Sequence, residues 1–186
     1  MFRFMSLVVV GGLALGLVFW GCSKNNSGSS ALLSEATQEV AGISWQLPKG
    51  WTTEAERPMR VATYRVPATG PDTAECAVFY FGTNQGGDVD MNIDRWASQF
   101  ETNQSPQRSS RQVDGIKVTE VKIAGTYLSP GGPMMMSQGR MENYELAGAI
   151  IEAPEGMVFF KLTGPAPEVE KAGAALEALV SSIHKK

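Results

Sequence analysis

The sequence predicts an α+β fold, with a mostly antiparallel sheet of about six to seven strands flanked by two main helices. Short segments in which apolar and polar residues alternate are separated by turns rich in Gly and Pro, as expected for strands. Two other segments repeat apolar residues three and four apart, as expected for amphipathic helices. Hairpin-like links join successive strands, which favours antiparallel pairing.

Three strands are expected in the first half of the domain, at Ile43–Leu47, Arg60–Val66 and Glu75–Phe81. The third is almost continuously apolar, which is typical of a strand near the centre of a sheet. Trp45 and Trp51 bracket the turn after the first strand, and we expect them to clamp this turn rather than to face solvent.

The first helix is expected after the glycine-rich segment Gly82–Gly87. Asp88 or Asp90 is its expected N-cap, because a carboxylate there accepts hydrogen bonds from unpaired amides and suits the helix dipole. Its buried face would consist of Ile93, Trp96, Ala97 and Phe100.

A polar loop is expected over Asn103–Ser110, followed by a hairpin. Asp114–Gly115 lies between strand-like residues, which is typical of a two-residue hairpin turn. A strand is then expected from Ile116 towards Tyr127. The last two strands are expected at Tyr144–Glu152 and Met157–Thr163.

The second helix is expected to begin near Pro165 and Pro167. Its apolar face would consist of Val169, Ala172, Leu176, Leu179, Val180 and Ile183. We expect it to end in His184, Lys185 and Lys186, whose basic side chains would complement the negative end of the helix dipole.

The first 22 residues have the pattern of a secretory signal. Arg3 supplies a positive start, an apolar run extends over Leu7–Trp20, and Gly21 and Cys22 end it. The run spans roughly 14 residues, whereas a transmembrane helix needs about 20. The sequence therefore predicts export across the cytoplasmic membrane.

The end of this signal, Phe19–Trp20–Gly21–Cys22, resembles the lipobox of bacterial lipoproteins. The family prefers Leu at the position of Phe19 and a small residue at that of Trp20. The resemblance implies a diacylglycerol on the Cys22 thiol, cleavage before Cys22, and a cell-envelope location at the outer membrane or the outer face of the cytoplasmic membrane. Ser23, rather than Asp, follows the cysteine and by the same resemblance favours the outer membrane. Ordinary cleaved secretion and an uncleaved N-terminal anchor are the alternatives.

The expected organisation is a signal peptide over residues 1–21, the lipidated cysteine with a flexible tether over 22–40, and one α+β domain over 41–186. Residues 23–30 are polar and small, which is typical of a tether. Ala31–Val40 is expected either to form a short helix or to extend the tether.

Charge and cysteine content exclude several kinds of partner and bond. Without residues 1–21 the chain keeps 15 basic and 19 acidic side chains, a net charge of −4, which argues against nucleic acid and against a polybasic contact with lipids. With Cys22 lipidated, Cys76 is the one remaining cysteine and no intramolecular disulfide can form. Cys76 lies in an apolar run and is expected to be a buried small hydrophobe rather than a reactive thiol.

The sequence does not contain a complete motif for metal binding or catalysis. Asp88–Asp94 imitates a calcium loop, but Ile93 and Gln99 stand where Gly and Glu are required. The single histidine, His184, argues against a zinc site and against Ser–His or Cys–His catalysis. Four acidic residues lie in or beside strands without any sign that two converge: Glu75, Glu120, Glu142 and Glu145.

The most unusual local feature is the segment Leu128–Met141, which lacks any hydrophobic period and is therefore expected to be a long loop. It contains Met134, Met135, Met136 and Met141. These methionines could pack on the edge of the core, contact a partner, or bind a soft metal such as Cu(I).

The domain also resembles the PsbP-like group of α/β/α sandwiches. The resemblance rests on Trp45–Trp51, a strand that runs into a Pro–x–Gly–Trp turn, and on the aromatic strand Val158–Leu162 followed by an amphipathic helix over Val169–Ile183. It implies a binding or accessory role beside a membrane complex rather than an enzyme. The group has no shared catalytic residues to carry over.

The expected function is that of a membrane-tethered extracytoplasmic lipoprotein, acting as a binding or accessory domain of a membrane-associated complex. Its expected partners are the lipid bilayer, through acylated Cys22, and a membrane protein; no cofactor is expected. The expected recognition surface is Leu128–Met141 together with Gly82–Asp88. The alternatives are an extracytoplasmic hydrolase with an unidentified carboxylate site, and copper handling by the Met-rich loop.

Overall fold

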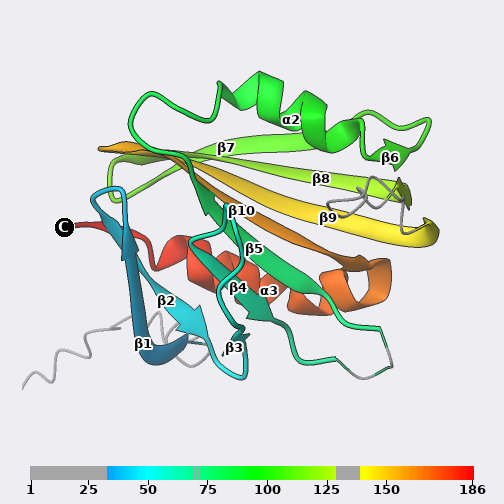
Figure 1. Cartoon of the computed structure of the whole chain (residues 1–186), viewed down its shortest axis with the longest axis horizontal. Helices are drawn as coiled ribbons and strands as arrows, with labels where there is room; N and C mark the ends of the chain where they lie inside the picture. The colour runs from blue at the N-terminus through cyan, green and yellow to red at the C-terminus, as the bar shows by residue number, and fades with distance from the viewer. Residues whose placement is uncertain (1–32, 69, 71, 129–138) are drawn as a thin grey trace, which may run out of the picture.

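The structure is a computed structural model, which describes residues 33–68, 70, 72–128 and 139–186. A large antiparallel sheet carries helix α2 (Val89–Ala97) on one face and helix α3 (Ala166–Ser181) on the other (Figure 1). A small sheet lies beside α3 at one end of the molecule (Figure 1). The predicted α+β class is therefore confirmed.

The large sheet has the strand order β3-β4-β5-β10-β9-β8-β6, and β7 pairs with another part of the long strand β8. Its strands are β3 (Thr52–Thr53), β4 (Ala62–Arg65), β5 (Glu75–Tyr80), β6 (Phe100–Glu101), β7 (Gln107–Val113), β8 (Ile116–Leu128), β9 (Arg140–Ala153) and β10 (Gly156–Pro165). The small sheet has the order β1-β2-β11, with β1 (Leu33–Val40), β2 (Ile43–Pro48) and β11 (His184–Lys185). Every pair of neighbours in both sheets is antiparallel.

Alternation along the central strand β10 builds two separate cores. Phe160 faces α3 and the small sheet, where its ring and that of Trp45 form a T-shaped pair with 5.1 Å between centroids. Phe159 faces α2, where it meets Trp96 at 6.5 Å. Each helix thus buries an apolar stripe against its own face of the sheet, which stabilises both layers.

Several local predictions are confirmed. The carboxylate of Asp88 caps α2 by accepting a 2.8 Å hydrogen bond from the amide of Met91. Asp114 and Gly115 form the tight turn between β7 and β8 with φ angles of 48° and 68°, as a type I′ hairpin requires. Trp45 and Trp51 are buried, 1% and 5% exposed, and the indole of Trp45 donates a 3.1 Å hydrogen bond to the Tyr64 hydroxyl.

The prediction of a short helix or tether at Ala31–Val40 is wrong over Leu33–Val40, which forms β1. This strand pairs with β2, with Gln38 opposite Trp45 and Val40 opposite Ile43. Backbone pairing and the packing of Val40 on the core hold it in place, although its sequence lacks a clear apolar alternation.

The ends of three other segments also differ from prediction. Residues 107–110 belong to strand β7 rather than to a polar loop, because they pair with residues 119–122 of β8, and their exposed side chains explain why the segment is polar. Phe100 is buried as expected but lies in β6 beyond the end of α2. The last residues do not extend α3, since His184 and Lys185 pair with Ser44 and Ile43 in β2. Among the described residues, no helix is long and apolar enough to cross a membrane.

Gly148 of β9 allows α2 to pack closely on the sheet. A Cβ built on it would lie 2.3 Å from Cζ3 of Trp96, so any side chain there must displace the indole. We therefore predict that Gly148→Ala lowers the free energy of unfolding by about 1–3 kcal/mol, as overpacked cores do. Denaturant unfolding of the variant measures this change.

Gly173 of α3 is the matched control, because a Cβ there meets no atom within 4 Å. Gly173→Ala should raise the free energy of unfolding by roughly 0.5–1 kcal/mol, since Ala favours the helical backbone. Equal changes in the free energy of unfolding for the two substitutions would show that the packing of Trp96 on Gly148 does not matter for stability.

Candidate functional site

A hollow of about 400 Å³ opens on the α2 face of the sheet, and we call it the basic pocket. It lies beside the end of α2, over strands β5 and β10. Aromatic rings form much of its wall: Phe79, Phe81, Trp96, Tyr127 and Phe159. Its lining also contains three cationic side chains, those of Arg60, Arg95 and Lys161, and one carboxylate, that of Glu75.

Strand register and helix position together create this hollow. Lys161 of β10 lies opposite Ala77 of β5, whose small side chain leaves space beside the lysine. Helix α2 covers the neighbouring strands with Trp96 over Gly148 and ends at Ala97. The part of the sheet face beyond that end therefore stays open.

The ammonium of Lys161 is the most unusual group in the pocket. It donates a 2.5 Å hydrogen bond to the side-chain oxygen of Gln99 and lies 5.5 Å from the centroid of the Tyr127 ring. Within the part of the chain that the structure describes, it forms no ion pair. A partly buried ammonium thus relies on a neutral amide and an aromatic ring.

The surroundings of Lys161 lower its pKa to about 8. Burial is the largest cause, and the nearby positive charges of Arg60 and Arg95 add to it, while Glu75 opposes them. Below pH 8 the side chain is mostly protonated, so at neutral pH the pocket contains a third positive charge.

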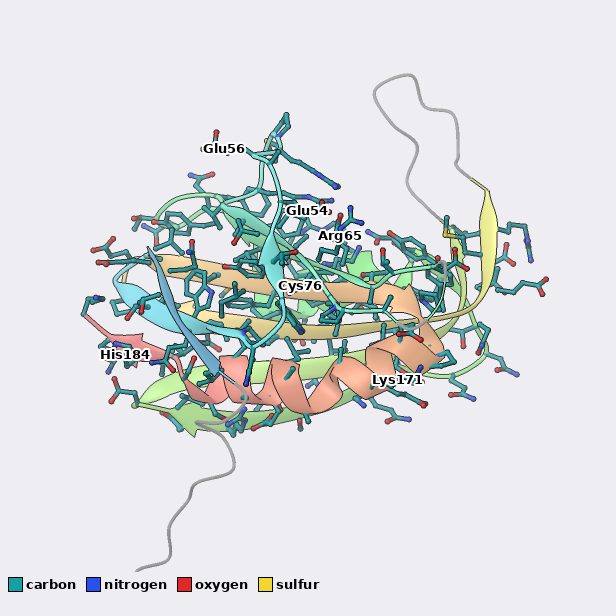
Figure 2. The ribbon with its side chains drawn as sticks, turned by 90° about the horizontal axis from the view of Figure 1, so that it is seen from below. Glu54, Glu56, Arg65, Cys76, Lys171 and His184 are labelled. Carbon is teal, nitrogen blue, oxygen red and sulfur yellow. The ribbon has the colours of Figure 1, made fainter. Side chains whose placement is uncertain are left out.

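Glu75 contributes little free negative charge to the pocket, because its carboxylate is already bound. It accepts from Arg60 at 2.6 Å and lies 2.9 Å from Arg57. Arg57 also pairs with Glu54 at 2.6 Å, and Glu54 pairs with Arg65 at 2.6 Å; Figure 2 shows Glu54 and Arg65 close together. This chain of ion pairs fixes Arg60 at the rim of the pocket.

Other groups complete the lining. The guanidinium of Arg60 lies 5.7 Å from the centroid of the Phe79 ring. Arg95 donates to the side-chain oxygen of Asn92, which keeps the guanidinium near the end of α2. The Thr163 hydroxyl is buried at the pocket without a hydrogen-bond partner among the described residues.

A second hollow, of about 380 Å³, lies between α3 and strands β7 and β8. Its lining contains cationic and anionic side chains in balance, Arg108 and Lys122 against Glu120 and Glu177. Arg111 bridges both acids, at 3.0 Å from Glu120 and 2.8 Å from Glu177. The second hollow therefore lacks the excess of positive charge that distinguishes the basic pocket.

Most site residues expected from the sequence lie elsewhere or outside the described residues. Cys22 and the run Met134–Met136 are outside them. Met141 belongs to β9, opposite Tyr127, and its half-buried side chain packs against the core below α2. In the segment 82–88, the side chains at 83–85 are exposed. The role of these residues in partner binding stays a prediction.

Cys76 is a buried small hydrophobe, as predicted. Its thiol is inaccessible within the core between the sheet and α3, and Figure 2 places it at the centre of the domain. Burial is the main reason why its pKa is raised to about 12. A thiol that is neutral and enclosed at neutral pH is a poor nucleophile.

Ser44 and His184 form a hydrogen-bonded pair that resembles part of a catalytic triad. Ser44 Oγ lies 2.8 Å from Nε2 of His184, while Nδ1 of the same ring lies 3.0 Å from the carbonyl oxygen of Ser182. A carbonyl only accepts, so Nδ1 carries a proton, and in the neutral imidazole Nε2 then accepts the hydrogen bond from the Ser44 hydroxyl. Ser44 is fully buried, and the pair anchors β11 to β2 rather than presenting a nucleophile.

The four carboxylates noted in the sequence have separate surroundings. Glu75 and Glu120 pair with arginines in different parts of the sheet, and Glu142 is exposed. Glu145 is 8% exposed and lies 3.8 Å from Lys122; burial is the main cause of its raised pKa. Among the described residues, no group of three or more His, Cys, Asp and Glu side chains could hold a metal ion.

The basic pocket was not predicted from the sequence. One signal was available, since Lys161 interrupts the apolar strand Val158–Leu162 at a position that alternates with Phe160 and shares the face of Phe159. No local pattern connects this lysine with Arg60 or Arg95, which come from a turn and from a helix.

Comparison with known proteins identifies the architecture. No protein family and no curated protein matches the sequence. The structure is similar to the solution structure of cyanobacterial PsbP (CyanoP) from Synechocystis sp. PCC 6803, with 13% identity, a TM-score of 0.53 and coverage of 97% of this chain and 99% of that chain. The fold is PsbP-like. At this identity the likeness concerns the PsbP-like fold alone.

The lowered pKa of Lys161 makes stability depend on pH. Lowering the pKa from 10.5 to about 8 costs the native state about 3 kcal/mol wherever both states are protonated. Between pH 8 and 10.5 the unfolded chain retains a proton that the native protein has lost, so this cost disappears as the pH rises.

We therefore predict that Lys161→Met stabilises the protein at pH 7 and that its advantage over the wild type narrows towards pH 10. Denaturant unfolding of both proteins at each pH gives the difference in their free energies of unfolding. The contribution of Cys76 ionisation is common to both proteins and cancels in this difference. A difference that stays constant from pH 7 to 10 would show that Lys161 is not desolvated.

Proposed function

We propose that this protein is a lipid-anchored, extracytoplasmic accessory domain that binds within a membrane-associated complex. The likeness to CyanoP over 97% of the chain carries the proposal, because it extends the PsbP-like resemblance of a few short motifs to the whole domain. The lipobox-like residues Phe19–Cys22 supply the means of attachment.

The length of chain before β1 supports a position close to the bilayer. Strand β1 begins at Leu33, so ten residues, 23–32, separate Cys22 from the folded domain. Even fully extended, ten residues span at most about 35 Å. Acyl chains on Cys22, which hold a protein at the membrane by about 0.8 kcal/mol for each buried methylene, would therefore keep the start of β1 within about 35 Å of the bilayer.

The end of the β8–β9 hairpin is the surface that we propose for the protein partner. Leu128 and Arg140 pair directly there, and Met141 follows in β9. The residues between these strands include Met134–Met136, whose thioether side chains adapt to varied apolar surfaces.

Replacing the acylated cysteine tests the anchor. Cys22→Ala should move the protein from the membrane fraction to the soluble fraction of the cell envelope, or leave it as an uncleaved precursor. Cell fractionation and the intact mass of the purified wild-type protein measure this. A wild-type mass that still includes Met1 and no acyl chains would contradict the lipoprotein assignment.

Replacing the loop methionines tests the partner surface. Met134, Met135 and Met136, changed together to Ser, should abolish crosslinking of the protein to its membrane partner in intact cells, because the apolar contact is lost. Met91→Ser is the matched control, since Met91 is an exposed methionine on α2, 62% exposed. Unchanged crosslinking in the triple variant would exclude this surface.

A further inference from the structure

The basic pocket holds more positive charge than the protein itself balances. Glu75 is the one carboxylate in its lining, and Arg57 and Arg60 already bind it. The ammonium of Lys161 and the guanidinium of Arg95 have neutral partners, the side chains of Gln99 and Asn92. This excess stands out in a chain with a net charge of −3.

A buried cation without a counter-ion is costly, because the protein interior solvates charge poorly. The cost falls when an anion enters and forms charge-assisted hydrogen bonds. Lys161, Arg95 and the buried Thr163 hydroxyl all supply donors at the pocket. These groups favour an anionic ligand over a neutral or cationic one.

The walls of the pocket favour a ligand that is apolar beyond its charged group. Phe79 and Phe81 are half-buried and stack 6.1 Å apart between centroids. Met59, 72% exposed, lies at the rim. A volume of about 400 Å³ matches a small organic molecule, and aromatic walls with a few polar groups are typical of such sites.

We propose that the basic pocket binds a small amphipathic organic anion, with its anionic group at Lys161 and Arg95 and its apolar body against Phe79 and Phe81. The shared chemistry is a carboxylate or sulfonate on an apolar body, whether a flat aromatic acid or an acyl chain. This activity goes beyond the proposed function and does not depend on the lipid anchor or on the loop methionines.

Binding of such an anion should depend on pH through Lys161. The charged or titratable groups that face this lysine are Arg60, Arg95, Glu75 and Tyr127. Burial raises the pKa of Tyr127 above its usual 10, so the tyrosine stays neutral below pH 10. Between pH 7 and 9.5, Lys161 is thus the group in this set that loses its charge, and anion affinity should fall.

The test uses the fluorescent aromatic sulfonate 1-anilinonaphthalene-8-sulfonate with the full-length purified protein. At pH 7 we expect saturable binding of one molecule per protein, at least about tenfold tighter than that of the uncharged N-phenyl-1-naphthylamine, because charge-assisted hydrogen bonds contribute about 1.5–3 kcal/mol. The sulfonate stays ionised throughout, so weaker binding at pH 9.5 reports on the protein.

Two variants and one control locate the site. Lys161→Met and Arg95→Gln should each weaken binding about tenfold, and Lys161→Met should also remove the fall between pH 7 and 9.5. Lys49→Met removes the same charge at an exposed position outside the pocket and should bind like the wild type. Thermal unfolding confirms that each variant is folded, and the exposed position of Arg95 makes its replacement safe for the fold.

Competition between the fluorophore and two other anions then shows which kind of apolar body the pocket accepts. Displacement of the fluorophore by 2-naphthoate but not by decanoate assigns a flat aromatic acid, and the reverse assigns an acyl chain. Equal binding of the charged and uncharged fluorophores, or wild-type affinity in both pocket variants, would overturn the proposal. Either result would leave the accessory function standing, because membrane attachment and partner crosslinking are measured separately.

Discussion

The pairing of β10 with β5 on one side and β9 on the other is the constraint on which the rest of the structure depends. A strand inside a sheet sends successive side chains to opposite faces, and in β10 both faces are apolar. Phe160 therefore requires a cover on one side and Phe159 on the other. Helix α3 and the small sheet cover Phe160, and α2 covers Phe159. The sandwich follows from this double burial.

The same alternation places a lysine where an apolar residue would pack better. Lys161 follows Phe160 in β10 and faces the α2 side, but α2 ends before it covers that position completely. The ammonium keeps a hydrogen bond to Gln99 and a contact with the Tyr127 ring, and neither partner neutralises its charge. Departures of this kind from the rules of core packing are expected at functional sites, where a ligand offsets their cost.

Local sequence signals were sufficient where short-range physics decides the conformation. The N-cap at Asp88 and the Asp114–Gly115 turn depend on neighbouring residues, so both could be predicted. Strand β1 and the first half of β7, residues 107–110, were missed because edge strands are held by backbone pairing, and their side chains need not alternate between apolar and polar. The candidate site was missed for a different reason. Its cations come from a turn, a helix and a strand that have no common pattern.

The sequence by itself determined the α+β class, the apolar faces of both helices and the burial of Cys76, because each depends on residue type and spacing. The tertiary structure alone decided which side chains meet. The register that sets Lys161 opposite Ala77, and the seat of Trp96 on Gly148, bring Arg60, Arg95 and Lys161 to one hollow. The physical reason is that electrostatic interactions act through space, whereas periodicity describes positions along the chain.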